Sequence, residues 1–273
     1  MFLILYIFLL LKYSIIYIKF SIFGQYSPEF MFTHQIPVEY DENAKWPQFN
    51  KFLKQIAVRN KRRRLTLEEF MGLCLTKDIG YGTAIILKGN GCNGKSVYCN
   101  VLCAMLGEGN YTTITLKDLS SFGSGKIPNK RLAIMTEISK STSTNLMTNE
   151  LKQIISGEHC DCNVKYKQNF DMRPFAKVLI LSNHEIGFLN DDSEGALRRV
   201  FIVPFEHYVS ADERDFQLED KLLTESSGIL NLALEGYRRL VKNGYQYSSK
   251  PESDRLIQDL IRTEKTSSTS KAT

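Results

Sequence analysis

A glycine-rich string that ends in lysine and serine is the first group of residues in this sequence whose types and spacing point to chemistry. Residues 89–96 read Gly-Asn-Gly-Cys-Asn-Gly-Lys-Ser and match the G-x-x-x-x-G-K-S spacing of a phosphate-binding loop at every required position. In such a loop, backbone N–H groups and a helix N-terminus face the phosphates, Lys95 reaches the β- and γ-phosphates, and Ser96 ligates Mg²⁺. The predicted nucleotide-binding residues are Gly89, Asn90, Gly91, Cys92, Asn93, Gly94, Lys95 and Ser96.

The residues on either side of the string favour this interpretation over a chance glycine turn before a helix. Residues 83–88 (TAIILK) form a short β-branched apolar run, and residues 97–106 are apolar and compatible with a helix that ends at Gly107. The order strand, loop, helix is the context that a phosphate loop requires.

Two polar residues follow other apolar runs that read as buried strands. The run 130–136 (KRLAIMT) leads to Glu137, and the run 176–182 (AKVLILS) leads to Asn183. At the carboxyl end of a parallel sheet, Glu137 would lie beside the phosphate loop, where a carboxylate orients or deprotonates water and helps to hold Mg²⁺. The amide of Asn183 would hydrogen-bond the γ-phosphate or the attacking water. The alternative for Glu137 is an ordinary exposed residue after a strand.

Alternating apolar and polar residues from Cys160 to Met172 predict a β-hairpin. Its tip would carry Lys165, Tyr166 and Lys167, which can contact phosphates and stack on a base. Lysines at a hairpin tip also serve solubility, so a solvated tip is an equal alternative.

Two arginines, Arg198 and Arg199, precede the apolar run 200–205 (VFIVPF). A guanidinium aimed at the nucleotide of a neighbouring subunit stabilises charge during phosphoryl transfer, and either arginine suits that role. The alternative is a pair of ordinary surface charges.

The composition sets wide limits on the function. The chain has 273 residues, 43% hydrophobic and 24% charged, with a formal net charge of +5 and a pI near 8.7. The positive charge fits an anionic partner but does not separate a nucleotide from a nucleic acid. The six cysteines lack paired C-x-x-C spacing and the four histidines lie far apart, so the sequence indicates neither a zinc site nor a disulfide framework.

The first 23 residues are overwhelmingly apolar and are interrupted by Lys12 and Lys19. Three interpretations stay open: translated sequence ahead of a later start such as Met31, a membrane anchor, and a buried strand or helix. A signal peptide fits less well, because a charged n-region and a small-residue cleavage site are missing.

The elements around the phosphate loop are predicted to be mainly helical. Apolar spacing predicts a helix over 46–56, and Thr66 with Glu69 forms a capping-box signature for the start of a second helix. The basic run 59–64 between them reads as a solvated loop, with contact to DNA phosphates as the alternative. Residues 111–126 read as a connection.

Two helices are expected in the second half of the chain, over residues 149–156 and 218–241. Residues 248–273 are polar and are expected to fray.

Taken in order, these motifs resemble those of superfamily 3 helicases, specifically the phage, plasmid and large-DNA-virus primase-helicase family. The resemblance spans roughly residues 27–244, including the leading YDENAKWP and the trailing KLLTESSGILNLALEGY. The motifs that carry it are GNGCNGKS, RLAIMTE, ELKQIISGE with the lysine hairpin, VLILSN and GALRRVFIVPFE.

The resemblance implies an α/β fold: an AAA+-like P-loop ATPase core with a mainly parallel sheet, a small helical domain before it and helices after it. It implies ATP and Mg²⁺ as cofactors. Thr136 stands where many ATPases have Asp, so Mg²⁺ would rest mainly on Ser96, Glu137 and water. The implied roles are Walker A for Lys95 and Ser96, Walker B for Glu137, sensor 1 for Asn183, and a finger acting in trans for Arg198 or Arg199.

The family also implies a hexameric ring that pulls single-stranded or forked DNA through a central pore, with Lys165, Tyr166 and Lys167 as the DNA-binding residues. The expected function is an ATP-dependent DNA helicase or translocase of viral or mobile-element replication. Primase or polymerase partners would then join it in the host cytoplasm or at a viral replication site, and only residues 1–23 could bring it to a membrane.

Two other function classes compete with the helicase. One is a non-catalytic or truncated remnant that binds nucleotide or DNA as a replication scaffold. The other is a small-molecule P-loop kinase, which is disfavoured because the arginines lie before a strand and not in a lid. The expected organisation is a leader (1–24), a small helical domain (25–80), the ATPase core (81–209), a C-terminal helical segment (210–245) and a polar tail (246–273).

Overall fold

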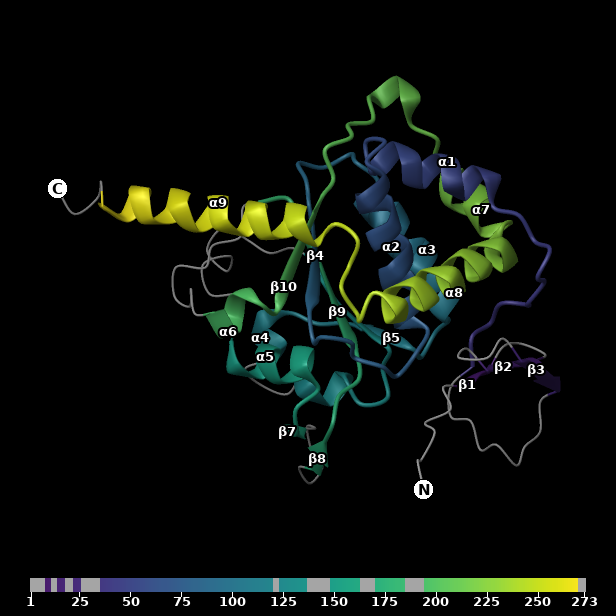
Figure 1. The fold of residues 1–273 in the computed structure, drawn as a ribbon, viewed down its shortest axis with the longest axis horizontal. Helices are drawn as coiled ribbons and strands as arrows, with labels where there is room; N and C mark the ends of the chain where they lie inside the picture. Colours follow the sequence, from purple (N-terminus) through teal and green to yellow (C-terminus); the bar gives the residue numbers. More distant parts are fainter. Residues whose placement is uncertain are drawn as a thin grey trace.

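A five-stranded parallel sheet forms the centre of the protein in the computed structural model, which describes residues 8–10, 14–17, 22–25, 35–119, 123–136, 148–162, 170–184 and 194–269 (Figure 1). Its strand order is β10-β4-β9-β6-β5, and every neighbouring pair is parallel. The strands are β4 (Ala84–Lys88), β5 (Tyr111–Thr113), β6 (Leu132–Met135), β9 (Lys177–Ser182) and β10 (Val200–Pro204).

Both faces of this sheet are covered, which is why its central strands are apolar at successive positions. In β4, Ile85 and Leu87 face one hydrophobic cluster, while Ala84 and Ile86 face the other. The expected α/β class with a mainly parallel sheet is confirmed.

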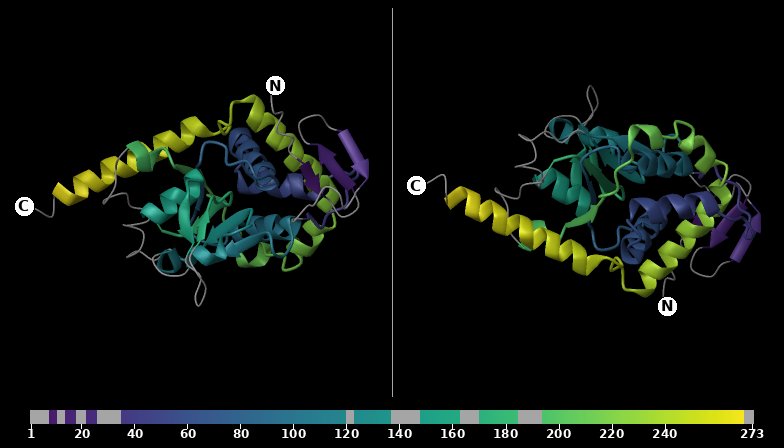
Figure 2. Two further views of the ribbon diagram at one scale, coloured as in Figure 1. Left: turned by 90° about the horizontal axis from the view of Figure 1, so that it is seen from below. Right: turned by 90° about the horizontal axis from the view of Figure 1, so that it is seen from above.

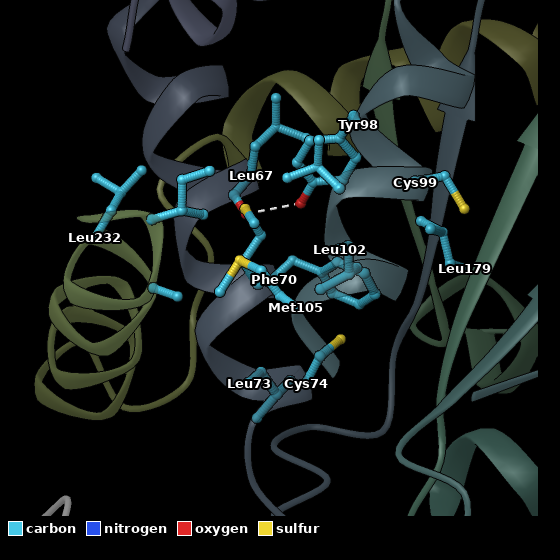
Figure 3. Close-up of a cluster of buried hydrophobic side chains, with 14 of the residues drawn as sticks. Leu67, Phe70, Leu73, Cys74, Tyr98, Cys99, Leu102, Met105, Leu179 and Leu232 are labelled. Carbon is cyan, nitrogen blue, oxygen red and sulfur yellow. Dashed lines mark hydrogen bonds between the residues drawn. The ribbon is translucent and has the colours of Figure 1, made fainter. Parts of the chain in front are cut away.

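Five helices pack on the first face or against each other beside it. They are α1 (Pro47–Ile56), α2 (Lys61–Cys74), α3 (Lys95–Leu106), α7 (Leu218–Leu223) and α8 (Ser226–Lys242). Figure 3 shows Tyr98 of α3 buried between α2 and the sheet, where its hydroxyl donates to Leu67 O at 2.8 Å. Helices α2 and α8 approach closely because they meet at Gly72 and Gly236; a Cβ at Gly72 would lie 2.1 Å from Ala233 O.

The second face packs against the other helical elements. These are α4 (Leu116–Leu119), η2 (Gly123–Lys126), α5 (Asn149–Ser156), α6 (Glu194–Leu197) and α9 (Lys250–Thr269). The predicted helix over 149–156 is therefore confirmed, as is the helical character of 218–241, which is divided between α7 and α8.

The predicted hairpin is also confirmed, as β7 (Cys160–Cys162) paired antiparallel with β8 (Phe170–Met172). Figure 1 shows it projecting from the body. The predicted tip with Lys165, Tyr166 and Lys167 lies outside the described residues.

The apolar N-terminal segment contains three short strands, β1 (Phe8–Leu10), β2 (Ser14–Tyr17) and β3 (Ile22–Gln25), which form an antiparallel sheet. In the described parts of the chain, no helix has the length and apolar character needed to cross a bilayer.

The predicted capping box at Thr66 and Glu69 is wrong, because α2 begins one turn earlier. The side chain of Asn60 accepts from the backbone N–H groups of Arg62 (3.0 Å) and Arg63 (3.3 Å) and so caps the helix at Lys61. Thr66 is buried inside the helix, and its hydroxyl contacts Ser249 Oγ at 2.9 Å.

The prediction of a solvated loop over the basic run 59–64 is wrong for the same reason. Its second half is the first turn of α2, and Arg63 is buried, 2.6 Å from Glu206 and 2.8 Å from Glu252. The guanidinium of Arg63 joins three distant segments and is not available to track DNA phosphates.

Two further expectations fail at elements with a weak sequence signal. The stretch 111–126, expected to be a connection, contains the edge strand β5, as well as α4 and η2. The polar end is not frayed over residues 250–269 but forms α9, whose Ser253 Oγ accepts from Ile202 N of the opposite edge strand at 2.9 Å. Buried Ile257 and Leu260 supply the apolar side of this helix, and Figure 2 shows it extending beyond the body.

Candidate functional site

The phosphate-loop string joins the carboxyl end of β4 to the first residue of α3, as its sequence context predicts. Gly94 is the N-cap of α3 and has φ +85°, a conformation that an L side chain rarely adopts. A Cβ at Gly89 would lie 2.2 Å from Asn93 Nδ2 and 2.3 Å from Phe205 O. The loop therefore needs glycine at these two positions for different reasons, positive φ at one and close approach at the other.

Hydrogen bonds hold the loop to the strands on both sides of β4. Gly89 N donates to Ser182 O of β9 at 3.0 Å, and Asn93 Nδ2 donates to Phe205 O, just beyond β10, at 3.1 Å. The loop is thus built into the carboxyl edge of the sheet, and its position follows from three strands together.

Lys95 is the buried cation of this loop, 5% exposed. Its Nζ donates to Gly89 O at 2.6 Å and to Asn93 Oδ1 at 3.1 Å. Burial lowers the pKa of Lys95 from its ordinary value. An ammonium carries three donors, so one backbone and one side-chain acceptor leave one N–H for an anion at the N-terminus of α3. Among the described residues no carboxylate pairs with this ammonium.

The remaining side chains of the string lie at its outer surface. Asn90, Cys92 and Ser96 are exposed. The Ser96 hydroxyl, next to Lys95 on the first turn of α3, is an oxygen donor of the type that Mg²⁺ prefers when phosphates supply other ligands. Within the part of the chain that the structure describes, no three His, Cys, Asp or Glu side chains form a metal cluster. Of the predicted Mg²⁺ ligands Ser96 and Glu137, the structure therefore places Ser96 alone, since Glu137 lies outside the described residues.

Asn183 lies next to this loop. The register pairs Lys88 of β4 with Ser182 of β9, so Asn183 leaves the sheet level with Gly89, and its side chain is exposed. The structure brings Asn183 and the phosphate loop together, as the sequence predicts for two strands of a parallel sheet.

The position of Glu137 lies outside the described residues, but the strand that leads to it is placed. β6 is separated from β4 by β9, and Met135, two residues before Glu137, pairs with Ile180. The direct neighbour of the phosphate loop is thus the strand that carries Asn183, and the strand expected to carry the acid is one position further.

Arg198 and Arg199 lie at the opposite end of the sheet from the phosphate loop of the same chain. Val200 pairs with Ala84, the first residue of β4, whereas the loop follows Lys88, the last. Five residues of parallel strand span about 17 Å. Neither arginine can therefore serve the loop of its own chain without a rearrangement of the sheet.

The two arginines differ in their surroundings. The Arg199 guanidinium donates to Ser156 Oγ at 2.7 Å and Gly195 O at 2.6 Å and pairs with Glu158 at 3.3 Å. The Arg198 side chain is exposed and makes no hydrogen bond or ion pair with the described residues. Arg199 is thus held by contacts within its own chain, whereas the Arg198 guanidinium is not held by any described residue.

A segment that the sequence reasoning missed lies against the loop. Residues 205–217, here named the strap, follow β10 and arch over the end of the molecule where α1 lies (Figure 1). Val209 N donates to Cys92 O at 2.8 Å, and the Arg214 guanidinium contacts Cys92 Sγ at 2.9 Å. The strap has no motif spacing, so only its contacts identify it.

The comparisons with known proteins are consistent with this geometry. Residues 87–199 match a family described as "Family of unknown function (DUF5906)". The chain is 24% identical over 232 residues to "Putative helicase L207/L206" of Acanthamoeba polyphaga mimivirus, and the alignment covers 76% of this chain and 24% of the relative. The curated match therefore relates this chain distantly to a viral protein described as a helicase.

Among solved structures, the chain resembles the C-terminal region of NrS-1. One structure of that region has a TM-score of 0.63 and 17% identity and covers 82% of this chain and 54% of the other. A second has a TM-score of 0.62 and 16% identity, with 88% and 57% covered. These identities show a shared fold, and this chain spans about a quarter of the curated relative and just over half of the NrS-1 region.

Proposed function

We propose that this chain is the ATP-hydrolysing motor of a viral or mobile-element DNA helicase or translocase. The observation that carries the proposal is the Lys95 ammonium, fixed at the N-terminus of α3 with one N–H left for an anion and with Asn183 on the adjacent strand. The distant relation to the mimivirus protein, whose name describes a helicase, supports coupling of this hydrolysis to a helicase function.

In the proposed mechanism, each of a few residues has one role in ATP hydrolysis. Lys95 and the backbone N–H groups of the loop hold the β- and γ-phosphates and stabilise the charge that develops on them. Asn183 holds the γ-phosphate or the attacking water through its amide. Glu137 takes the proton of that water. Mg²⁺, held by Ser96, by Glu137 through water and by the phosphates, would neutralise further charge.

We assign the role in trans to Arg198. It is exposed, it lies about 17 Å from the loop of its own chain by strand length, and it makes no hydrogen bond or ion pair with the described residues. A neighbouring subunit of a ring fits it best. A hexameric ring around single-stranded DNA would then place Lys165, Tyr166 and Lys167 at the hairpin tip toward the nucleic acid.

The test is ATP hydrolysis by purified protein with and without single-stranded DNA, beside Glu137→Gln. The proposal expects hydrolysis that DNA stimulates, and a Glu137→Gln protein that binds ATP but turns it over at least about 100-fold more slowly. Normal turnover by Glu137→Gln would remove this residue from the mechanism. ATP and DNA binding without hydrolysis in the wild-type protein would favour the scaffold.

A further inference from the structure

Two aromatic side chains on the strap are largely exposed, Tyr208 at 66% and Phe216 at 93%. Tyr208 directly precedes Val209, whose backbone N–H donates to the phosphate loop, whereas the attachment nearest Phe216 is made by the long side chain of Arg214, two residues away. We propose that Tyr208 stacks on the nucleobase of the nucleotide whose phosphates the loop binds. This proposal rests on the proposed function, because it adds the base-recognition element to the same site.

The order of the strands gives the direction in which the nucleotide must extend. The terminal phosphate has to face Asn183, and β9, which carries Asn183, lies on one side of β4. A nucleoside triphosphate is an extended molecule with its base at the end opposite the γ-phosphate. The ribose and base therefore extend to the other side of β4, where β10 ends and the strap begins.

The strap is fixed in place on that side by a series of contacts. Phe205 N donates to Lys88 O at 2.7 Å, and Val209 N donates to Cys92 O at 2.8 Å. The His207 Nε2 atom lies 2.8 Å from the side-chain amide nitrogen of Gln55 on α1. Tyr208 lies between His207 and Val209 in the chain, and both of these residues make one of the hydrogen bonds above. Its backbone is therefore held beside the loop while its ring stays accessible.

The end of α1 lies against the same phosphate loop. Ile56 and Phe52 contact Gly94 of the phosphate loop; a Cβ on Gly94 would lie 2.7 Å from Ile56 Cγ2. Two residues later, Val58 is 48% exposed and has φ +49°, which is rare for a β-branched residue. The end of α1 is also hydrogen-bonded to the strap, through Gln55 and His207. Val58 is thus an exposed apolar side chain at the same end of the sheet as Tyr208.

These surroundings fit a flat aromatic group of the ligand, which in a nucleotide is the base. The cationic groups of the site, Lys95 and Arg214, lie at the loop itself, where phosphates bind. Stacking on a tyrosine ring accepts any base and is worth about 1–3 kcal/mol per base. The strap would therefore strengthen nucleotide binding without strict selection of adenine, and it would favour purines over pyrimidines because their larger rings cover more of Tyr208.

The experiment compares ligands with and without a base. Dissociation constants for ATP, CTP and inorganic tripolyphosphate are measured calorimetrically, with Mg²⁺, for wild-type protein, Tyr208→Ala, Tyr208→Trp and Phe216→Ala. We expect Tyr208→Ala to weaken ATP binding about 5- to 10-fold, to leave tripolyphosphate binding unchanged and to reduce the preference for ATP over CTP. Tyr208→Trp should keep the wild-type values. Phe216→Ala, which removes a more exposed ring from the same strap, should match wild type for all three ligands.

Three results would overturn the proposal. Unchanged ATP binding in Tyr208→Ala would show that the ring does not touch the base. An equal loss for ATP and tripolyphosphate would show that Tyr208 supports the loop and not the base. If wild-type protein bound neither ATP nor tripolyphosphate, the proposed nucleotide site itself would fail, which is a different outcome from normal tripolyphosphate binding with no contribution from Tyr208.

Discussion

The two ends of the parallel sheet both bury cations, but they use them differently. At the carboxyl end, Lys95 donates to Gly89 O and Asn93 Oδ1, and its third N–H has no acceptor among the described residues. At the amino end, Lys177 Nζ donates to Thr76 O, and Arg131 donates to Leu75 O at 2.6 Å. The acceptors at the amino end are the carbonyls that follow α2, so those cations cap a helix.

The difference follows from which end of a helix each cation meets. The C-terminus of a helix carries partial negative charge and unpaired carbonyls, which Lys177 and Arg131 satisfy directly. The N-terminus of α3 carries partial positive charge, so Lys95 adds to a positive region that favours an anion. A buried lysine therefore indicates a ligand site only when its surroundings leave positive charge uncompensated.

The largest expected effect comes from removing the cation at the carboxyl end. Lys95→Ala should lower ATP turnover at least about 100-fold, because the developing phosphate charge loses its nearest cation. Its thermal unfolding temperature should stay close to that of wild type, since burial disfavours the Lys95 ammonium and offsets its two hydrogen bonds. ATPase assays and calorimetric unfolding check both halves, and normal hydrolysis would contradict the assignment of the loop.

Of the two arginines at the amino end of the sheet, only Arg198 should have a large effect on catalysis. Arg198→Ala should lower turnover in the assembled protein about 1000-fold, at the low end of the range for arginine fingers. Mixing it with Lys95→Ala should restore part of the activity, because sites with both residues intact form between unlike subunits. Arg199→Ala is the matched control: it should lower stability, because Ser156 and Glu158 lose their partner.

Absence of rescue in mixed oligomers that are verified by native mass would contradict the trans role of Arg198. An Arg199→Ala protein with normal stability but no turnover would transfer the role to Arg199.

A smaller effect is expected from Lys177, on stability and not on catalysis. Burial lowers the pKa of Lys177 to about 7 from its ordinary value of 10.5. Between these values the unfolded chain binds more protons than the folded one, so this group makes the unfolding free energy rise with pH, by up to about 1.4 kcal/mol per unit. The useful window is pH 7 to 9, because burial raises the pKa of Cys74 to about 12, and this second group contributes a slope of opposite sign above its ordinary value of 9.0.

Urea unfolding across pH 7 to 9 measures this slope. Lys177→Met should remove most of it while ATP binding stays at the wild-type level. Lys130→Met, at a half-buried lysine just before β6 that donates to Gly109 O at 2.6 Å, should keep the slope. An equal slope in wild type and Lys177→Met would mean that Lys177 is not the group responsible.

Local patterns were enough to predict the phosphate loop and its supports. The run 83–88 became β4 (Ala84–Lys88) and the run 97–106 lies in α3, because strand, glycine loop and helix are each specified by adjacent residues. The short strand β5 was missed because Tyr-Thr-Thr has no apolar run, and its pairing with β6 alone defines it. Helix α9 was missed because it has few apolar residues. These residues pack on the side of the sheet where β10 is the edge strand, which the sequence of the helix alone does not indicate.

Features that depend on distant residues could not be read from the sequence. The basic run appeared solvated because the partners of Arg63, Glu206 and Glu252, lie more than 140 positions away. The strap carries no motif, and its relation to the phosphate loop depends on single hydrogen bonds such as Val209 N to Cys92 O. The strand order that separates β6 from β4 is equally a tertiary result.

The smallest expected effect concerns the hairpin, and it tests whether this projecting element acts on DNA. If Lys165 and Lys167 contact DNA phosphates, Lys165→Ala combined with Lys167→Ala should leave basal ATP hydrolysis intact, because β7 and β8 are separate from the phosphate loop. Each lost contact on single-stranded DNA reduces the slope of log affinity against log salt by about 0.7, so the double variant should lose up to about 1.4 per subunit and fail to unwind.

A matched control removes the same charge elsewhere. Lys51→Ala with Lys242→Ala takes two exposed lysines from α1 and α8 and should leave the salt slope and unwinding unchanged. DNA affinity measured from low to moderate salt, together with unwinding rates, separates the two cases. Equal slopes in the hairpin and control variants, with normal unwinding in both, would show that the hairpin tip does not contact DNA. The exposed Lys61 and Arg62 of α2 would then be the next residues to test for DNA contact.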